Sequence, residues 1–432
     1  MVLFMRNSLL HQFTGVCVGV LVAAGLCGEL KIISAARADA TDIARAALLA
    51  KARQQCAVAI GLFDQALKQG QFSLKEEGLL IFSRGVCFEN LGVRQKALAD
   101  FNSAIALVPD FANAYNYRGI VWGDLHEYDR AIADFEQASR LKPNDPLVFN
   151  NLGNAFAAKD ELAKAIANYD RAIEIHPGYA EAYYNRASTY VALHDELHAL
   201  ADYDEAIRLQ PTYDGAYTNR GVLKLTRGEI RQAISDFDSA VRLNQRDLRA
   251  LMNRAHAFLV ANRAHDAVSD FSSVIEAEPG NAAAYLGRGR AALFSDGKSQ
   301  SIDDFLTAHR LLPTSAYTVL WLHIARTHLG ENDTEEFKEN SKKIIRDAWP
   351  GVLLDIYDGV ESPEKARTTA AAGSPQERNQ RLCEVDFFVG DYAAHHRPSS
   401  EARELLQAAV SKCQSHEPSY IAAKFELNLL NP

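Results

Sequence analysis

Few of the motifs that support enzyme chemistry occur in this 432-residue sequence. There is no glycine-rich phosphate loop and no nucleophile motif. His395 and His396 adjoin each other, but they lack the i, i+4 partner or glutamate that a zinc site on a helix requires. The sequence therefore predicts no enzyme activity, no cofactor and no bound metal.

The sequence also has fewer basic than acidic residues. Lysine and arginine total 46 against 55 aspartates and glutamates, which gives a formal net charge of −9. A surface of this sign is repelled by phosphate backbones and by anionic lipid headgroups. We therefore expect neither nucleic acid nor an anionic membrane surface as the partner.

An apolar run long enough to span a bilayer is lacking as well. The run from Val16 to Cys27 falls short of the roughly 20 residues that a span needs, and Glu29 follows it closely. Arg6 precedes the run and small residues lead to Ala38, so residues 1–38 are typical of a secretory signal peptide. The alternative is an uncleaved anchor.

Lipid attachment is disfavoured, because neither cysteine in this segment directly follows small residues: Cys17 comes after Val16 and Cys27 after Leu26. Cleavage removes three basic residues and one acidic residue, so the formal charge becomes −11. We expect a secreted chain with no stable membrane insertion after cleavage.

The most informative feature present is an aromatic ring that recurs every 34 residues. Small residues lie four positions before and three after each ring, which places them on the same helix face. A proline eight residues after the ring ends the helix in all but one unit, where Gln245 stands instead. A fixed period of 34 built from two helical patterns indicates a repeat array. The rings are Phe101, Phe135, Tyr169, Tyr203, Phe237, Phe271 and Phe305.

This spacing resembles the tetratricopeptide repeat family over residues 78 to about 349. The resemblance implies an all-α fold, a right-handed superhelical solenoid of antiparallel helix pairs with about eight to nine repeats. First helices of the pairs would line its concave face.

The predicted organisation has five segments. They are a signal peptide (1–38), N-terminal capping helices (39–77), seven regular repeats plus one degenerate repeat (78–349), a linker or helical connection (350–382), and a C-terminal hairpin with a capping helix (383–432). The polar stretch 367–380 is expected to be mobile.

Six of the seven regular repeats have an arginine 16 residues before an aspartate. The seventh has Leu152 and Asn168, so both charges are absent together. We predict an ion pair between the two helices of one repeat. The alternative, an anion-binding row of arginines, is weaker because a guanidinium forked to a carboxylate has few donors left. The pairs are Arg84–Asp100, Arg118–Asp134, Arg186–Asp202, Arg220–Asp236, Arg254–Asp270 and Arg288–Asp304.

Four of the six cysteines remain after cleavage, and four cysteines allow three connectivities. We predict Cys383–Cys413, which stand at the two ends of the last hairpin, and Cys56–Cys87, on consecutive helices at the other terminus. Both bonds would fasten ends that lack a stacking neighbour. The alternative is four buried free thiols, although an oxidising compartment favours disulfides.

The resemblance places partner recognition on the concave face, where side chains change from amides to apolar groups along the chain. Amides can pair with an extended backbone while apolar ends fill pockets, which suits a peptide or a helix. The alternative is that several of these residues pack against the following repeat. The predicted groove consists of Asn116, Asn150, Asn151, Asn154, Tyr184, Asn185, Asn219, Leu225, Met252, Asn253, Leu259, Leu286, Leu293 and Phe294.

The chain from residue 317 onward resembles the C-terminal part of NlpI-type periplasmic repeat proteins of Gram-negative bacteria. The shared features are a Trp–Leu helix at Trp321, an apolar helix after Trp349, and a Phe-Phe/Gly element at Phe387. Such proteins are homodimeric outer-membrane scaffolds that gather cell-wall hydrolases and a protease. This chain differs in lacking a lipobox and in having about twice the repeats.

Together these patterns predict a scaffold secreted to the periplasm of a Gram-negative bacterium, with a protein or peptide as partner. Its expected role is envelope assembly or regulation of peptidoglycan enzymes. The alternative is a self-associating scaffold, a homodimer formed through an exposed apolar tail around Trp321 and Trp349.

Overall fold

The computed structural model describes residues 39–295, 297–358, 363–396 and 399–430. These ranges are helical and contain no strand. They form two compact units, unit 1 up to Leu209 and unit 2 from Gln210 onward. The predicted signal peptide lies outside the described residues. No helix in the described ranges is both long and apolar enough to cross a membrane.

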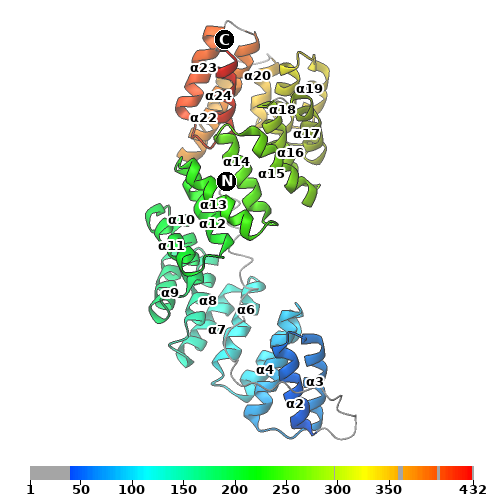
Figure 1. Ribbon diagram of the computed structural model, residues 1–432, viewed down its shortest axis with the longest axis vertical. Coiled ribbons are helices and arrows are strands. Elements are labelled where there is room, and N and C mark those ends of the chain that lie inside the picture. The colour runs from blue at the N-terminus through cyan, green and yellow to red at the C-terminus, as the bar shows by residue number, and fades with distance from the viewer. Residues whose placement is uncertain (1–38, 296, 359–362, 397–398, 431–432) are drawn as a thin grey trace. The chain divides into compact units, whose positions relative to one another are not determined.

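Unit 1 consists of five helix pairs (Figure 1). Their bounds are α2 Ala40–Ala52, α3 Cys56–Gln69, α4 Leu74–Asn90, α5 Arg94–Leu107, α6 Ala112–Asp124, α7 Tyr128–Leu141, α8 Pro146–Ala158, α9 Leu162–Ile175, α10 Ala180–Ala192 and α11 Glu196–Leu209.

Unit 2 continues with three regular pairs and then a less regular C-terminal part. Its helices are α12 Asp214–Thr226, α13 Ile230–Leu243, α14 Leu248–Val260, α15 Ala264–Ala277, α16 Ala282–Leu293, α17 Lys298–Leu311, α18 Ala316–His328, α19 Thr334–Ser341, the short 3-10 helix η2 Gly351–Leu353, α20 Leu354–Asp358, α21 Pro363–Ala370, α22 Pro375–His396, α23 Ser399–Lys412 and α24 Pro418–Leu429.

The seven periodic rings form the seam inside each pair. All of them are at most 2 % exposed, and they lie on the second helices α5, α7, α9, α11, α13, α15 and α17. In five of the seven pairs a glycine on the facing first helix admits the ring; a Cβ added at Gly153, for example, would lie 2.5 Å from the Tyr169 ring. These second helices end two residues before the proline, or before Gln245. The predicted all-α array of helix pairs is confirmed.

The N-terminal region is more regular than its description as capping helices suggests. Helix α3 buries Ala59, Phe63 and Ala66 completely, at the spacing of a second helix, and α2 pairs with it. Helix α4 begins at Leu74 because Ser73 and Glu76 form a capping box in which each side chain bonds the other's backbone N–H.

The stretch 367–380, predicted to be a mobile connection, is mostly helical: α21 extends to Ala370, and α22 begins at Pro375. Helix α22 thus begins eight residues before the expected start of the last hairpin. Its first turn is stabilised by Ser374, whose backbone N–H and hydroxyl both donate to the Glu377 carboxylate at 2.9 Å. The polar composition of this stretch belongs to a capped helix start rather than to a loop.

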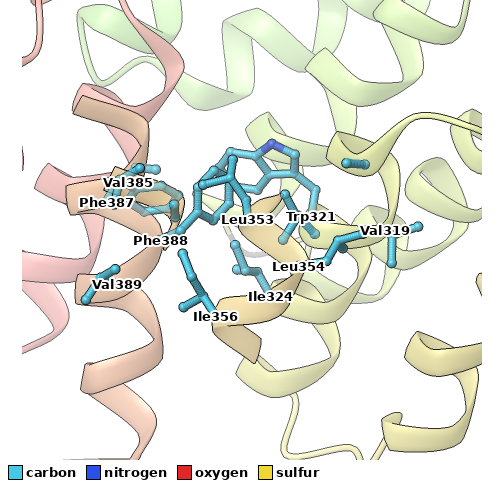
Figure 2. Packing of buried hydrophobic residues seen from close by; sticks show 14 of the residues in the cluster. Val319, Trp321, Ile324, Leu353, Leu354, Ile356, Val385, Phe387, Phe388 and Val389 are labelled. Atoms are coloured by element: carbon cyan, nitrogen blue, oxygen red, sulfur yellow. The ribbon is translucent and has the colours of Figure 1, made fainter. Parts of the chain in front are cut away.

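The C-terminal part of unit 2 is built around Trp321, which is 4 % exposed. Its ring stacks on Phe387 at 5.7 Å and on Phe305 at 6.3 Å between ring centroids. Figure 2 shows Phe387 and Phe388 of α22 beside Trp321 and Leu353. The expectation of an exposed apolar tail around Trp321 is therefore wrong, because α22 covers the indole. Trp349 is half-buried.

Candidate functional site

All six predicted Arg–Asp pairs are present, each between the two helices of one repeat. In Arg118–Asp134 the Nε and Nη2 groups donate to the two carboxylate oxygens at 2.8 and 2.6 Å. The other five have the same two-point geometry. The carboxylates are nearly buried, with side-chain exposures of 2 to 9 %.

A third nitrogen of several of these arginines reaches back to the preceding repeat. Arg118 Nη1 donates to Asn102 at 2.7 Å, and Arg254 Nη1 donates to Asp238 at 2.9 Å. A guanidinium engaged on both edges has little left to offer an anion. The anion-binding alternative for this row therefore finds no support in the geometry.

The two predicted disulfides differ in outcome. Cys383 and Cys413 are joined, and the bond links α22 with the end of α23. Cys56 and Cys87 are free and buried thiols, so this prediction is wrong in the structure. Burial, together with a hydrogen bond to Cys56, raises the pKa of the Cys87 thiol to about 12, so this thiol is protonated at neutral pH.

In unit 1, the predicted groove amides pair with one another across neighbouring first helices. Asn151 Nδ2 donates to Asn116 Oδ1 at 3.1 Å, and Asn185 Nδ2 donates to Asn150 Oδ1 at 3.0 Å. Asn154 accepts the hydroxyl of Tyr169 at 2.8 Å. These amides join helices, and their expected role in holding a partner's backbone is therefore wrong for the buried members.

Burial divides the predicted groove into core and surface. Eight of the predicted groove residues are buried within the protein and present no free surface, so they are corrected to core: Asn150, Asn154, Tyr184, Asn185, Asn219, Leu225, Leu259 and Leu293. The half-buried remainder is Asn116, Asn151, Met252, Asn253, Leu286 and Phe294. We call the side of the first helices that carries this remainder the first-helix face.

In unit 2, helix α24 lies against the first-helix face. Phe425 contacts Phe294 with ring centroids 4.8 Å apart, and Ile421 packs on the apolar cluster that contains Leu225 and Leu259. The predicted apolar end of the groove is thus occupied by the chain's own C-terminal helix.

Polar contacts hold the same segment in place. Burial lowers the pKa of His256 to about 4, so its ring is neutral, and its Nε2 lies 2.5 Å from the backbone carbonyl oxygen of His416. Two first helices further along, at the end of α18, His328 Nε2 lies 2.7 Å from Glu426 Oε1 on α24. Sequence analysis missed both histidines, because their partners lie 160 and 98 residues away.

Family models agree with this architecture over two stretches. A model described as TPR repeat matches residues 124–160 and 153–193. Two models described as tetratricopeptide repeat match residues 180–213, and 218–270 together with 252–300.

Several solved structures are similar to this chain. YrrB, described as a TPR protein with an unusual peptide-binding site, is 23 % identical, with a TM-score of 0.39 over 43 % of this chain and 95 % of its own. MamA is 22 % identical, with a TM-score of 0.35 over 37 % and 94 %. PilF of Pseudomonas aeruginosa is 16 % identical, with a TM-score of 0.45 over 49 % and 97 %.

The family models identify tetratricopeptide repeats in two stretches between residues 124 and 300. Tetratricopeptide repeats form protein interaction scaffolds and are generally not catalytic. The narrower resemblance to NlpI-type proteins is not among these matches and stays a prediction. The helix pairs and the matched stretches together show that this chain contains an array of tetratricopeptide repeats.

Proposed function

We propose that this protein is a periplasmic scaffold that binds a helix of a protein partner on the first-helix face of unit 1. One observation supports the binding mode above the others: α24 packs on the first-helix face of unit 2 through Ile421 and Phe425. An amphipathic helix lying in a groove is a common recognition mode.

In unit 1, the first-helix face offers a mixed surface for such a helix. Asn116 and Ile120 lie one turn apart on α6 and are half-buried, as is Asn151 on the next first helix. Leu147, 44 % exposed, stands near the start of α8. Apolar groups beside amides suit a helix with one apolar side and a polar edge.

The cellular setting rests on the N-terminal sequence and on the negative charge. Secretion to the periplasm would follow from cleavage of residues 1–38, and a role in envelope assembly or in peptidoglycan-enzyme regulation would follow from that location. The homodimer alternative has lost its main support, since Trp321 is buried. Dimerisation stays an untested prediction.

Site-specific photo-crosslinking in cells tests the binding face. A photoreactive residue at Ile120 should give a crosslink to one defined partner in the periplasmic fraction. The matched control is Leu197 on α11, which is 75 % exposed. Because it is more exposed than Ile120, a photoreactive residue there should collide more often with unrelated proteins. Partner crosslinks from Leu197 but not from Ile120 would contradict the proposal.

A further inference from the structure

Three ionisable side chains from three helices of unit 2 meet in one place. They are His328 at the end of α18, Asp391 on α22 and Glu426 on α24. One ligand atom from each, an imidazole nitrogen and two carboxylate oxygens, lies within 4.8 Å of the other two. The histidine and Glu426 side chains are only 6 and 5 % exposed, and Asp391 is 2 % exposed.

Asp391 is not satisfied by the protein groups around it. Its Oδ2 accepts the Tyr357 hydroxyl at 2.6 Å, but its Oδ1 is buried without a hydrogen-bond partner among the described residues. A buried carboxylate oxygen without a partner is costly, and such an atom in a native fold calls for a missing partner such as an ion.

The charges of Asp391 and Glu426 also favour a bound cation. Two buried carboxylates repel each other, and a single imidazolium can balance only one of them. A divalent cation would balance both and would leave the imidazole neutral, which is the form that ligates metals.

The surrounding groups suit a metal site. Tyr357 orients one ligand carboxylate, as outer hydrogen bonds do in metal centres. His395 follows Asp391 by one helical turn, and its Nδ1 lies 3.0 Å from the Asp391 backbone carbonyl oxygen. Donation from Nδ1 to that oxygen leaves Nε2 as the basic nitrogen, and the His395 ring centroid is 5.3 Å from that of His328.

The donor set selects the class of ion. One imidazole nitrogen and two carboxylate oxygens suit Zn²⁺ and similar first-row ions. Calcium takes six to eight oxygen ligands and magnesium keeps several waters, neither of which this buried cluster supplies. We infer that His328, Asp391 and Glu426 bind one Zn²⁺ ion that fastens α24 and α22 to α18, with water as the fourth ligand.

Calorimetric titration of the EDTA-treated protein with Zn²⁺ tests this inference. We expect one equivalent to bind and the thermal unfolding midpoint to rise. Asp391→Asn keeps an acceptor for Tyr357 but removes a ligand, and it should weaken Zn²⁺ binding by about 100-fold or more. Co²⁺ should give a visible ligand-field absorption that this variant loses.

His323→Gln is the matched control. His323 lies on the same helix, and its Nδ1 is 2.9 Å from both oxygens of Asp333, but it belongs to no three-ligand group among the described residues. Its Zn²⁺ affinity should equal that of the wild type. The inference is overturned if the wild type binds no stoichiometric Zn²⁺, or if Asp391→Asn, shown to be folded by circular dichroism, binds as tightly as His323→Gln.

Discussion

Replacing Trp321 by alanine should destabilise the C-terminal part of unit 2 by about 3 to 5 kcal/mol, the usual range for removing a large buried ring. The indole is 4 % exposed and contacts rings from α17 and α22, as Figure 2 shows for Phe387. Because it joins the last regular repeat to the C-terminal helices, its loss leaves a cavity that neither side can fill alone.

Urea unfolding followed by limited proteolysis would measure this effect. We expect cleavage sites in the C-terminal helices to open at lower urea concentration while unit 1 remains protected, since stability in repeat arrays is a sum of neighbour terms. Trp349→Ala is the control, because Trp349 is half-buried and should cost clearly less. Equal losses from the two variants would show that Trp321 is not the centre of this core.

The second large effect is expected at an ion pair. Arg118→Leu leaves Asp134, with an 8 % exposed side chain, without its guanidinium. Breaking a buried pair from one side costs 3 to 5 kcal/mol, and we expect about 3 here, because the Arg118 side chain is 21 % exposed and water reaches the site.

One repeat has leucine and asparagine in place of the arginine and aspartate, and it is the template for a double variant. Arg118→Leu with Asp134→Asn copies the natural pair Leu152 and Asn168, in which the Asn168 amide donates to the Lys164 carbonyl one turn earlier. The double variant should therefore recover most of the stability lost by Arg118→Leu alone. Chemical denaturation curves of the wild type, Arg118→Leu and the double variant measure this. A double variant no more stable than Arg118→Leu would show that the loss does not come from the unpaired Asp134 carboxylate.

Local periodicity was enough to predict most of the array. The ring row, the proline stops and the six Arg–Asp pairs depend on contacts within one repeat, so their spacing appears directly in the sequence. Cys383 and Cys413 also stand at the ends of one hairpin. In contrast, the predicted groove mixed core with surface, because residues such as Asn150 and Leu293 on first helices also pack against neighbouring helices.

The position of α24 could not be predicted in this way. His416, just before α24, contacts His256, and Glu426 on α24 contacts His328; these pairs are 160 and 98 residues apart, and no repeat period relates them. Asp391 and Tyr357 also meet only after the C-terminal helices have packed. Long-range packing of an irregular segment leaves no periodic signal in the sequence.

The central claim is that the first-helix face accepts a helix, as α24 does in unit 2. Hydrogen–deuterium exchange on the full chain and on a chain ending at Glu417, which lacks α24, tests it most directly. We expect faster exchange in α14 and α16 of the shortened chain and unchanged exchange in α6 and α8. Unchanged exchange in α14 and α16 would contradict the claim, since α24 would then not cover that face.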